Sequence, residues 1–303
     1  MRILLIGQAA FAQRVLDGLR ARGHEIAAVY CPPDMLGAKT DPLKTRALEL
    51  AIPIHQHATL KGPAVASEVA GYRADLGVLA YVTQIVPQSA FSAPRLGSIC
   101  FHPSLLPRYR GGSAIAWQII KGETRTGVSV FWVDPGIDTG PVLLQKAAAI
   151  GPDDTAGSLY YNTLFELGVE TVLEAVDLIA AGTAPRLPQD ESQASYDPLC
   201  RDEHALVDWD RPVAEVYNLI RGCDPQPGAY VMRAGDKLRL YDARRADAAA
   251  APGVVAAIDQ RGIVVGAGGG SIAIGRLRVG DKKLAAREAA TALGLAIGKP
   301  LAN

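Results

Sequence analysis

Apolar residues in the first half of the chain follow two alternating patterns. Short continuous runs closed by glycine or proline are typical of buried strands, whereas apolar positions three and four residues apart predict helices. A strand–helix–strand rhythm predicts an α/β fold with a doubly wound, Rossmann-like, mostly parallel sheet. The predicted strands are 2–7, 25–32, 52–57, 76–82 and 97–102, and the predicted helices are 12–23, 43–51, 63–72 and 87–91.

The pattern changes in the second half. Two apolar runs flank the turn "PGIDT" and predict a strand pair, and a long helical stretch follows with Asp154 as its expected N-cap. Beyond a proline-rich, aperiodic linker, short strands separated by turn residues predict a smaller β-rich, barrel-like domain. The predicted strand pair is 126–134 and 140–150, and the predicted helices are 154–183, 213–222 and 284–294. The first domain is expected at 1–183, the linker at 184–204 and the second domain at 205–303.

Composition narrows the function classes. The 303 residues contain 31 Lys and Arg against 31 Asp and Glu, so no overall field favours nucleic acid or an anionic membrane. No apolar run approaches the roughly 20 residues of a membrane span, and "MRILLIG" is too short for a secretory signal. Four widely spaced cysteines give neither a zinc motif nor a disulfide framework. We expect a cytoplasmic protein, and the sequence does not predict its oligomeric state.

Ligands of doubly wound sheets bind at the carboxyl ends of the strands, which directs attention to residues 80–88, 102–112 and 134–140. A nicotinamide cofactor would require the spacing G-x-G-x-x-G after the first strand, so that the backbone can approach a pyrophosphate. Here Gly7 stands alone and is followed by Gln8 and Ala9. We therefore expect no nicotinamide cofactor.

His102 and Asp138 are the candidates for chemistry. His102 ends a predicted strand, and Pro103 forces the chain out of the sheet there. Asp138 lies in the turn between the paired strands, where Asp134 is the expected turn former. A lone histidine is more often a satisfied packing residue, and a turn aspartate is ordinary, but a carboxylate beside an imidazole forms a general acid–base pair.

Other polar residues have less specific interpretations. Arg108 and Arg110 follow His102 in a loop and could meet an anionic group or simply be solvated. His55 and His57 alternate within "IPIHQH" and share one strand face, for which a solvated face is a better interpretation than a metal pair. We therefore predict no metal site.

The segment from residue 102 to 146, "HPSLLPRYRGGSAIAWQIIKGETRTGVSVFWVDPGIDTGPVLLQK", resembles the signature of enzymes that use 10-formyltetrahydrofolate. This formyltransferase family includes enzymes that act on methionyl-tRNA, on glycinamide ribonucleotide and on sugar nucleotides. The further segments "IGQAAFAQRV", "APRLPQ" and "YNLIRGCDPQPGAY" extend the likeness over almost the whole chain. They are most similar to the hydrolase domain of 10-formyltetrahydrofolate dehydrogenase.

The resemblance implies roles for particular residues. It makes residues 1–183 a folate-binding catalytic domain with His102 and Asp138 as its catalytic pair. Cys100 occupies the position of an asparagine that stabilises the oxyanion in most of the family, and loss of such a donor typically removes about 3–4 kcal/mol of transition-state stabilisation. Cys100 could instead act as a nucleophile, because it shares a strand face with His102. The positions implied to hold the pteridine ring are Leu79, Tyr81, Gln84, Ile85, Val86, Pro87, Val133, Asp134, Gly136 and Asp138.

The resemblance also implies the reaction. We expect transfer of the formyl group of 10-formyltetrahydrofolate, the co-substrate, to an acceptor amine. Two alternatives stay open: hydrolysis to tetrahydrofolate and formate, with water as the acceptor, and a folate-binding module without turnover. A small amine is favoured over tRNA, because basic and acidic residues balance in the predicted second domain.

Overall fold

The computed structural model describes residues 1–302, which form two compact units. The first unit comprises Met1–Gly111, Gly127–Ala148 and Thr163–Tyr196, and the second comprises the remaining described residues. Both units are therefore discontinuous in sequence, whereas the sequence analysis expected continuous domains. Residues 184–196 of the expected linker belong to the first unit.

The first unit is built on a sheet with the strand order β3-β2-β1-β4-β5-β6-β7. Its first five strands pair in parallel, and β6 runs antiparallel to β5. The expected doubly wound, mostly parallel sheet is confirmed, and its carboxyl edge carries the end of β5 at His102. The strands are β1 (Arg2–Gly7), β2 (Glu25–Tyr30), β3 (Ile54–His55), β4 (Leu76–Ala80), β5 (Ser98–His102), β6 (Arg125–Trp132) and β7 (Val142–Ala149).

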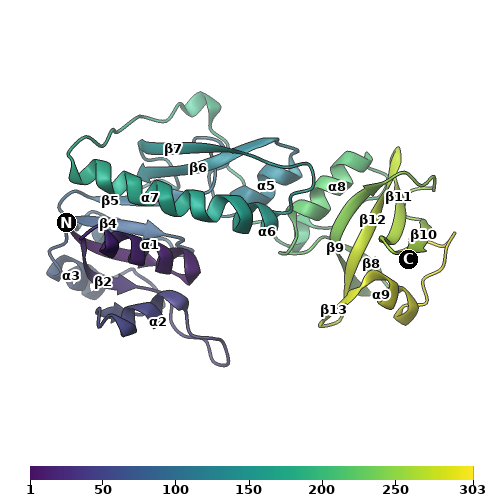
Figure 1. The fold of residues 1–303 in the computed structure, drawn as a ribbon, viewed down its shortest axis with the longest axis horizontal. Coiled ribbons are helices and arrows are strands. Elements are labelled where there is room, and N and C mark those ends of the chain that lie inside the picture. The colour runs from purple at the N-terminus through teal and green to yellow at the C-terminus, as the bar shows by residue number, and fades with distance from the viewer. Residues whose placement is uncertain (303) are drawn as a thin grey trace. The chain divides into compact units, whose positions relative to one another are not determined.

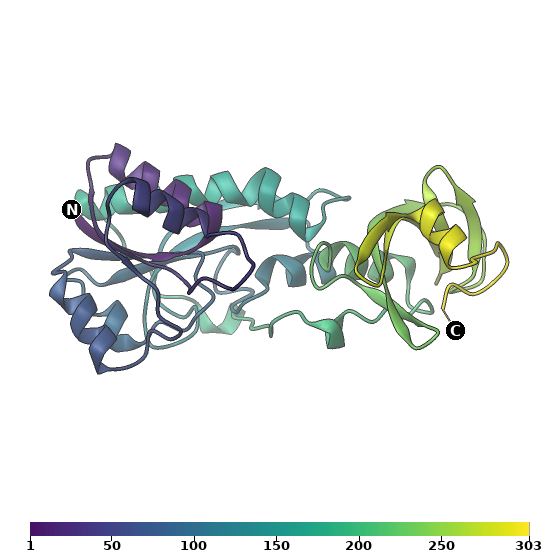
Figure 2. The same cartoon turned by 90° about the horizontal axis from the view of Figure 1, so that it is seen from below.

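Helices cover both faces of this sheet. Helices α1, α2 and α7 lie on one face and α3 on the other (Figures 1 and 2). The buried positions of α1 recur at helical spacing, and Gly18 lets α7 approach closely, since a Cβ there would lie 2.5 Å from Cδ1 of Leu173. The helices are α1 (Ala9–Ala21), α2 (Pro42–Glu49), α3 (Pro63–Gly71), α4 (Gln88–Phe91) and α7 (Phe165–Ala180).

Two predicted helices differ from the structure. The stretch 154–183 is divided into α6 (Ala156–Leu159), a π-helical turn (Tyr160–Leu164) and α7. Its N-cap is Thr155 rather than Asp154, because Thr155 and Ser158 form a reciprocal capping box while the Asp154 carboxylate accepts from the Gly151 amide. At the end of the chain, residues 284 and 285 form a strand instead of a helix, because their backbone pairs with β12.

The second unit contains an antiparallel sheet with the strand order β10-β11-β12-β9-β8 and with β13 paired to β12. This confirms the expected smaller β-rich domain. Its apolar core includes Val216, Ile220, Leu240, Ile272 and Ile274. The elements are α5 (Ala114–Ile120), α8 (Val213–Gly222), β8 (Tyr230–Arg233), β9 (Asp236–Ala246), β10 (Val255–Asp259), β11 (Gly262–Ala267), β12 (Gly270–Val279), β13 (Lys282–Ala285) and α9 (Ala286–Ala292).

The cysteines of the second unit lie close together, although they are far apart in sequence. The Sγ atoms of Cys200 and Cys223 are 3.9 Å apart. Their shared hydrogen bond lowers the pKa of Cys200 and, together with burial, raises that of Cys223. Both are free thiols. Among residues 1–302, none of the helices has the length and apolar character needed to cross a membrane.

Candidate active site

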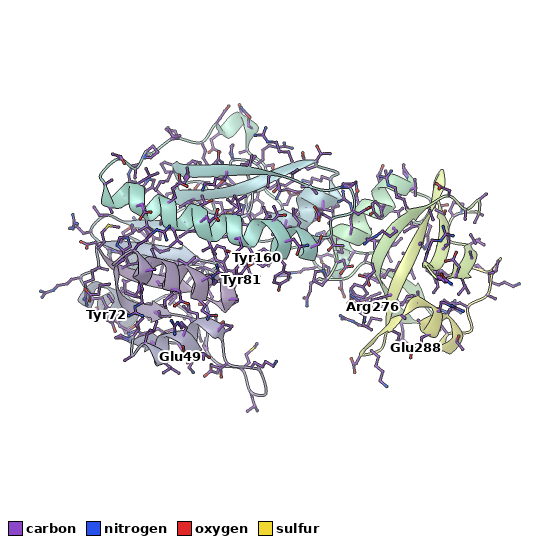
Figure 3. All side chains as sticks on the ribbon, viewed as in Figure 1. Glu49, Tyr72, Tyr81, Tyr160, Arg276 and Glu288 are labelled. Atoms are coloured by element: carbon purple, nitrogen blue, oxygen red, sulfur yellow. The ribbon has the colours of Figure 1, made fainter. Side chains whose placement is uncertain are left out.

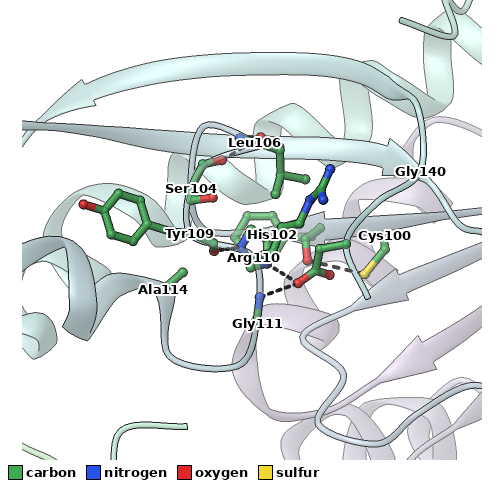
Figure 4. Close-up of polar contacts among 12 residues, drawn as sticks. Cys100, His102, Ser104, Leu106, Tyr109, Arg110, Gly111, Ala114 and Gly140 are labelled. Carbon is green, nitrogen blue, oxygen red and sulfur yellow. Dashed lines mark hydrogen bonds and ion pairs between the residues drawn. The ribbon is translucent and has the colours of Figure 1, made fainter. Parts of the chain in front are cut away.

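The structure brings His102 and Asp138 together. His102 is the last residue of β5, where it pairs with Ser129 of β6, and it is only 5% exposed. Its Nε2 lies 2.7 Å from the carbonyl oxygen of Tyr109 (Figure 4). A carbonyl only accepts, so Nε2 carries a proton and donates it. The other ring nitrogen, Nδ1, therefore faces Asp138, with its Oδ2 atom 3.5 Å away.

Asp138 is held in an unusual backbone conformation by its own turn. Its φ is +56°, a left-handed value that is uncommon outside glycine, although aspartate adopts it more readily than most residues. Its Oδ2 accepts a hydrogen bond of 2.8 Å from the Gly111 amide. Asp134 closes the turn as expected, since its Oδ1 accepts from the Gly136 amide and the Thr139 hydroxyl. The Asp138 side chain is 18% exposed, so it is partly accessible from solvent.

Gln189 holds the Asp138 turn from outside, and sequence reasoning missed it. Its Nε2 donates to the carbonyl oxygens of Asp138 and Gly140, at 2.8 and 2.7 Å. Its Oε1 accepts from Arg110, whose guanidinium also pairs with Glu191. Arg110 is thus buried and paired within the first unit rather than offered to an anionic ligand. The one sequence signal for Gln189 was its place in the segment "APRLPQ", which formed part of the resemblance.

The loop after His102 is fixed by a network of hydroxyl and amide groups centred on the buried Ser129. Ser129 Oγ donates to the Ser104 carbonyl oxygen and accepts from the Leu106 amide. Gln145 Nε2 bonds both Ser129 Oγ and the Leu106 carbonyl oxygen, at 2.8 and 2.9 Å. Because the Tyr109 carbonyl belongs to this loop, the network also orients the His102 imidazole.

Cys100 lies on β5 between Leu79 of β4 and Phe131 of β6. Its thiol packs beside apolar residues and donates a weak hydrogen bond of 3.5 Å to the Phe101 carbonyl oxygen. Burial, with a smaller contribution from the Asp138 charge, raises the pKa of this thiol. A thiol with a raised pKa carries little thiolate at neutral pH, which disfavours Cys100 as a nucleophile.

The two segments expected to hold a pteridine ring lie next to each other. Val86 and Val133 pack against the same buried cluster, which includes Leu79, and the Val133 amide donates to the carbonyl oxygen of Ser98 in β5. Tyr81 (Figure 3) directly follows β4, has a φ of +60° and is 40% exposed. Of the remaining residues in these segments, Ile85 and Gly136 are exposed, and Gln84, Pro87 and Asp134 are half-buried.

A pocket lies at the carboxyl ends of β1, β2 and β4. It is lined by Ile6, Gly7, Gln8, Tyr30, Cys31, Pro32, His57, Leu60, Val82, Thr83 and Gln84. Gln84 is thus common to this pocket and to the segments expected to contact the pteridine. The pocket adjoins the ends of three parallel strands, as expected for a ligand site in a doubly wound sheet.

Comparison with known proteins assigns the family. Residues 1–176 match the model of the formyl transferase family, and residues 200–293 match the formyl transferase C-terminal domain. The chain belongs to the formyl transferase family. This formyl transferase is 39% identical over 288 residues to methionyl-tRNA formyltransferase of Geobacter sulfurreducens. The aligned region covers 93% of this chain and 90% of that protein.

Other relatives are larger proteins. The formyl transferase is 44% identical over 247 residues to cytosolic 10-formyltetrahydrofolate dehydrogenase of Homo sapiens, which covers 80% of this chain and 27% of that protein. The chain thus spans about a quarter of the length of such relatives. Among solved structures, HypX from Aquifex aeolicus in complex with tetrahydrofolic acid has a similar fold, with a TM-score of 0.73 and 24% sequence identity. The match covers 98% of this chain and 48% of the HypX chain.

Proposed function

We propose that this formyl transferase takes the formyl group from 10-formyltetrahydrofolate and passes it to an acceptor amine. The observation that carries the proposal is the pairing of His102 Nδ1 with the Asp138 carboxylate at the carboxyl edge of the sheet. The relatives support the choice of donor: one carries 10-formyltetrahydrofolate in its name, and one similar fold was solved with tetrahydrofolic acid. The segments 79–87 and 133–138 would hold the pteridine ring.

In the proposed mechanism, the two side chains divide the proton transfers. The amine nitrogen attacks the formyl carbon, and Asp138 accepts the proton that the nitrogen loses. A proton on His102 Nδ1 bonds the developing oxyanion and is then delivered to N10 of the folate as the carbon–nitrogen bond breaks. The products are the formylated amine and tetrahydrofolate. His102 Nδ1 and Asp138 Oδ2 are 3.5 Å apart, and catalytic hydrogen bonds often shorten when a reactant binds.

The likeness to cytosolic 10-formyltetrahydrofolate dehydrogenase, at 44% identity over 247 residues, favours a second candidate function, hydrolysis. The Cys100 side chain has no amide group to donate a hydrogen bond to the oxyanion. Such a donor typically raises the rate by about 10²–10³-fold. The oxyanion forms whether an amine or water attacks, so the missing donor slows both reactions, but water activated by Asp138 needs no acceptor-binding surface. The products would then be formate and tetrahydrofolate.

Product analysis separates these functions. The chain is incubated with 10-formyltetrahydrofolate alone and with candidate acceptors: a small primary amine, an amino sugar nucleotide and methionyl-tRNA. A formylated amine supports transfer, formate without amine supports hydrolysis, and folate binding without either product leaves only a binding role.

The assigned roles are tested with His102→Ala and Asp138→Asn. We expect each variant to lose activity by about 10²-fold or more while it retains tetrahydrofolate affinity. Near-normal turnover in either variant would refute the assigned roles.

A further inference from the structure

A cluster of metal-ligand side chains lies where β3 faces α3, and three strands of the sheet, β2, β1 and β4, separate β3 from β5 and His102. His55 ends β3, His57 follows two residues later, and Glu68 belongs to α3. His55 Nδ1 lies 2.9 Å from Glu68 Oε2, and His57 Nε2 lies 3.0 Å from Glu68 Oε1. One donor atom from each residue lies within 4.8 Å of the other two. The sequence analysis favoured a solvated face here, but the three side chains are 21%, 32% and 30% exposed.

The contacts within this cluster require a positive charge or a proton. Carboxylate oxygens only accept, so each contact of Glu68 with an imidazole nitrogen must contain a proton or be bridged by a cation. Two imidazoles that converge on both oxygens of one carboxylate form a compact set of three ligands. Zn²⁺ sites use the same donor types and leave a fourth position for water. Mg²⁺ and Ca²⁺ prefer oxygen ligands alone, so this donor set selects a transition metal.

The orientation of His55 supports a metal role. Its Nε2 lies 2.5 Å from the Tyr72 hydroxyl, so the nitrogen opposite the ligand atom already has a partner (Tyr72 is labelled in Figure 3). Metal-bound histidines nearly always have such an outer partner, which fixes the tautomer and the ring orientation. The ring also stacks on Tyr30, with centroids 4.8 Å apart and planes 20° apart.

We propose that His55, His57 and Glu68 bind one divalent transition-metal ion of the Zn²⁺ type. Such an ion would tie the edge of the sheet to the helix that packs on it. Strand β3 contributes only Ile54 and His55 to the sheet, so the ion would add a link to a short edge strand. His57 also lines the pocket at the ends of β1, β2 and β4, so the ion would order one wall of that pocket.

The test titrates the chelator-treated full chain with Zn²⁺ by calorimetry and with Co²⁺ by visible absorption. We expect one ion per chain, tetrahedral Co²⁺ bands and a rise in Tm on Zn²⁺ addition. Glu68→Gln and His57→Ala should each weaken binding by at least about 100-fold, and Tyr72→Phe, which removes only the outer partner, by about 10–100-fold. His204→Ala is the matched control, because His204 also faces a glutamate, at 3.8 Å, but lies outside the cluster; it should bind like the wild type.

Two results would overturn the proposal. One is a wild-type chain that binds no stoichiometric Zn²⁺. The other is a Zn²⁺ affinity that is unchanged in both Glu68→Gln and His57→Ala. If Cys31→Ser then abolishes Zn²⁺ binding, the ion lies elsewhere in the pocket. Circular dichroism of the metal-free variants checks their folding, and Glu68→Gln, which keeps the size of the side chain, decides the question if His57→Ala does not fold.

Discussion

Substitution of Gln189 by alanine tests whether the strap formed by residues 184–196 positions the Asp138 carboxylate, to which we assign a catalytic role. The change removes two hydrogen bonds of 2.8 and 2.7 Å to the Asp138 and Gly140 carbonyls, and also the acceptor for Arg110. A hydrogen bond contributes about 0.5–1.5 kcal/mol net. Because Gln189 is half-buried, water replaces part of the loss. We expect a loss of about 1–2 kcal/mol in the free energy of unfolding, equivalent to a fall in Tm of about 2–6 °C.

The effect on turnover should exceed the effect on stability. Asp138 has a φ of +56°, and the carbonyl that Gln189 holds belongs to that same residue, so release of the turn lets the carboxylate move away from His102. A displacement of about 1 Å in a reacting group can lower the rate by about 10²-fold. We therefore expect kcat for formyl release from 10-formyltetrahydrofolate to fall about 10- to 100-fold, with a smaller change in KM.

The matched control for this experiment is Gln193→Ala. Among the described residues, the side-chain amide of Gln193 donates a hydrogen bond to Asp190, on the same strap, and to none in the Asp138 turn. We expect wild-type kcat and little change in Tm. If Gln189→Ala lowers Tm as calculated but keeps the wild-type kcat, the strap does not position Asp138, and the reasoning is refuted.

Three further predictions follow from local chemistry. Because its pKa is lowered, Cys200 should react with iodoacetamide at neutral pH well before Cys31, whose burial raises its pKa to about 11; peptide mass spectrometry measures the order. The pKa of Asp202 is lowered to about 2, and its hydrogen bond with Arg239 is the largest cause. The ion pair therefore stabilises the fold above about pH 4, and this stabilisation is lost as the pH falls toward 2. Asp202→Asn should lower Tm at about pH 7 but not at about pH 2. Gly140→Ala should lower both Tm and activity, since a Cβ there would lie 1.7 Å from a β6 carbonyl oxygen; wild-type Tm would contradict this.

The order and type of most elements follow from local patterns. Buried parallel strands read as continuous apolar runs, and amphipathic helices read as spaced ones, so β1, β4, β5 and α3 lie close to their predicted ranges. Element ends were less predictable. The capping box at Thr155 and the pairing of residues 284 and 285 with β12 depend on partners that periodicity does not reveal.

The sequence by itself determined which residue types stand at the carboxyl edge of the sheet, because strand ends and turn residues carry local signals. It therefore selected His102 and Asp138 as candidates, but not their distance. Only the tertiary structure placed Asp138 beside His102, brought Gln189 to the same turn, and gathered His55, His57 and Glu68. The contacts of Asp138 with His102 and Gln189 join residues 36 and 51 positions apart, and the contacts of Glu68 join a strand end to a helix. They depend on how the strands and helices pack together. Local sequence patterns identify each element but do not reveal that packing.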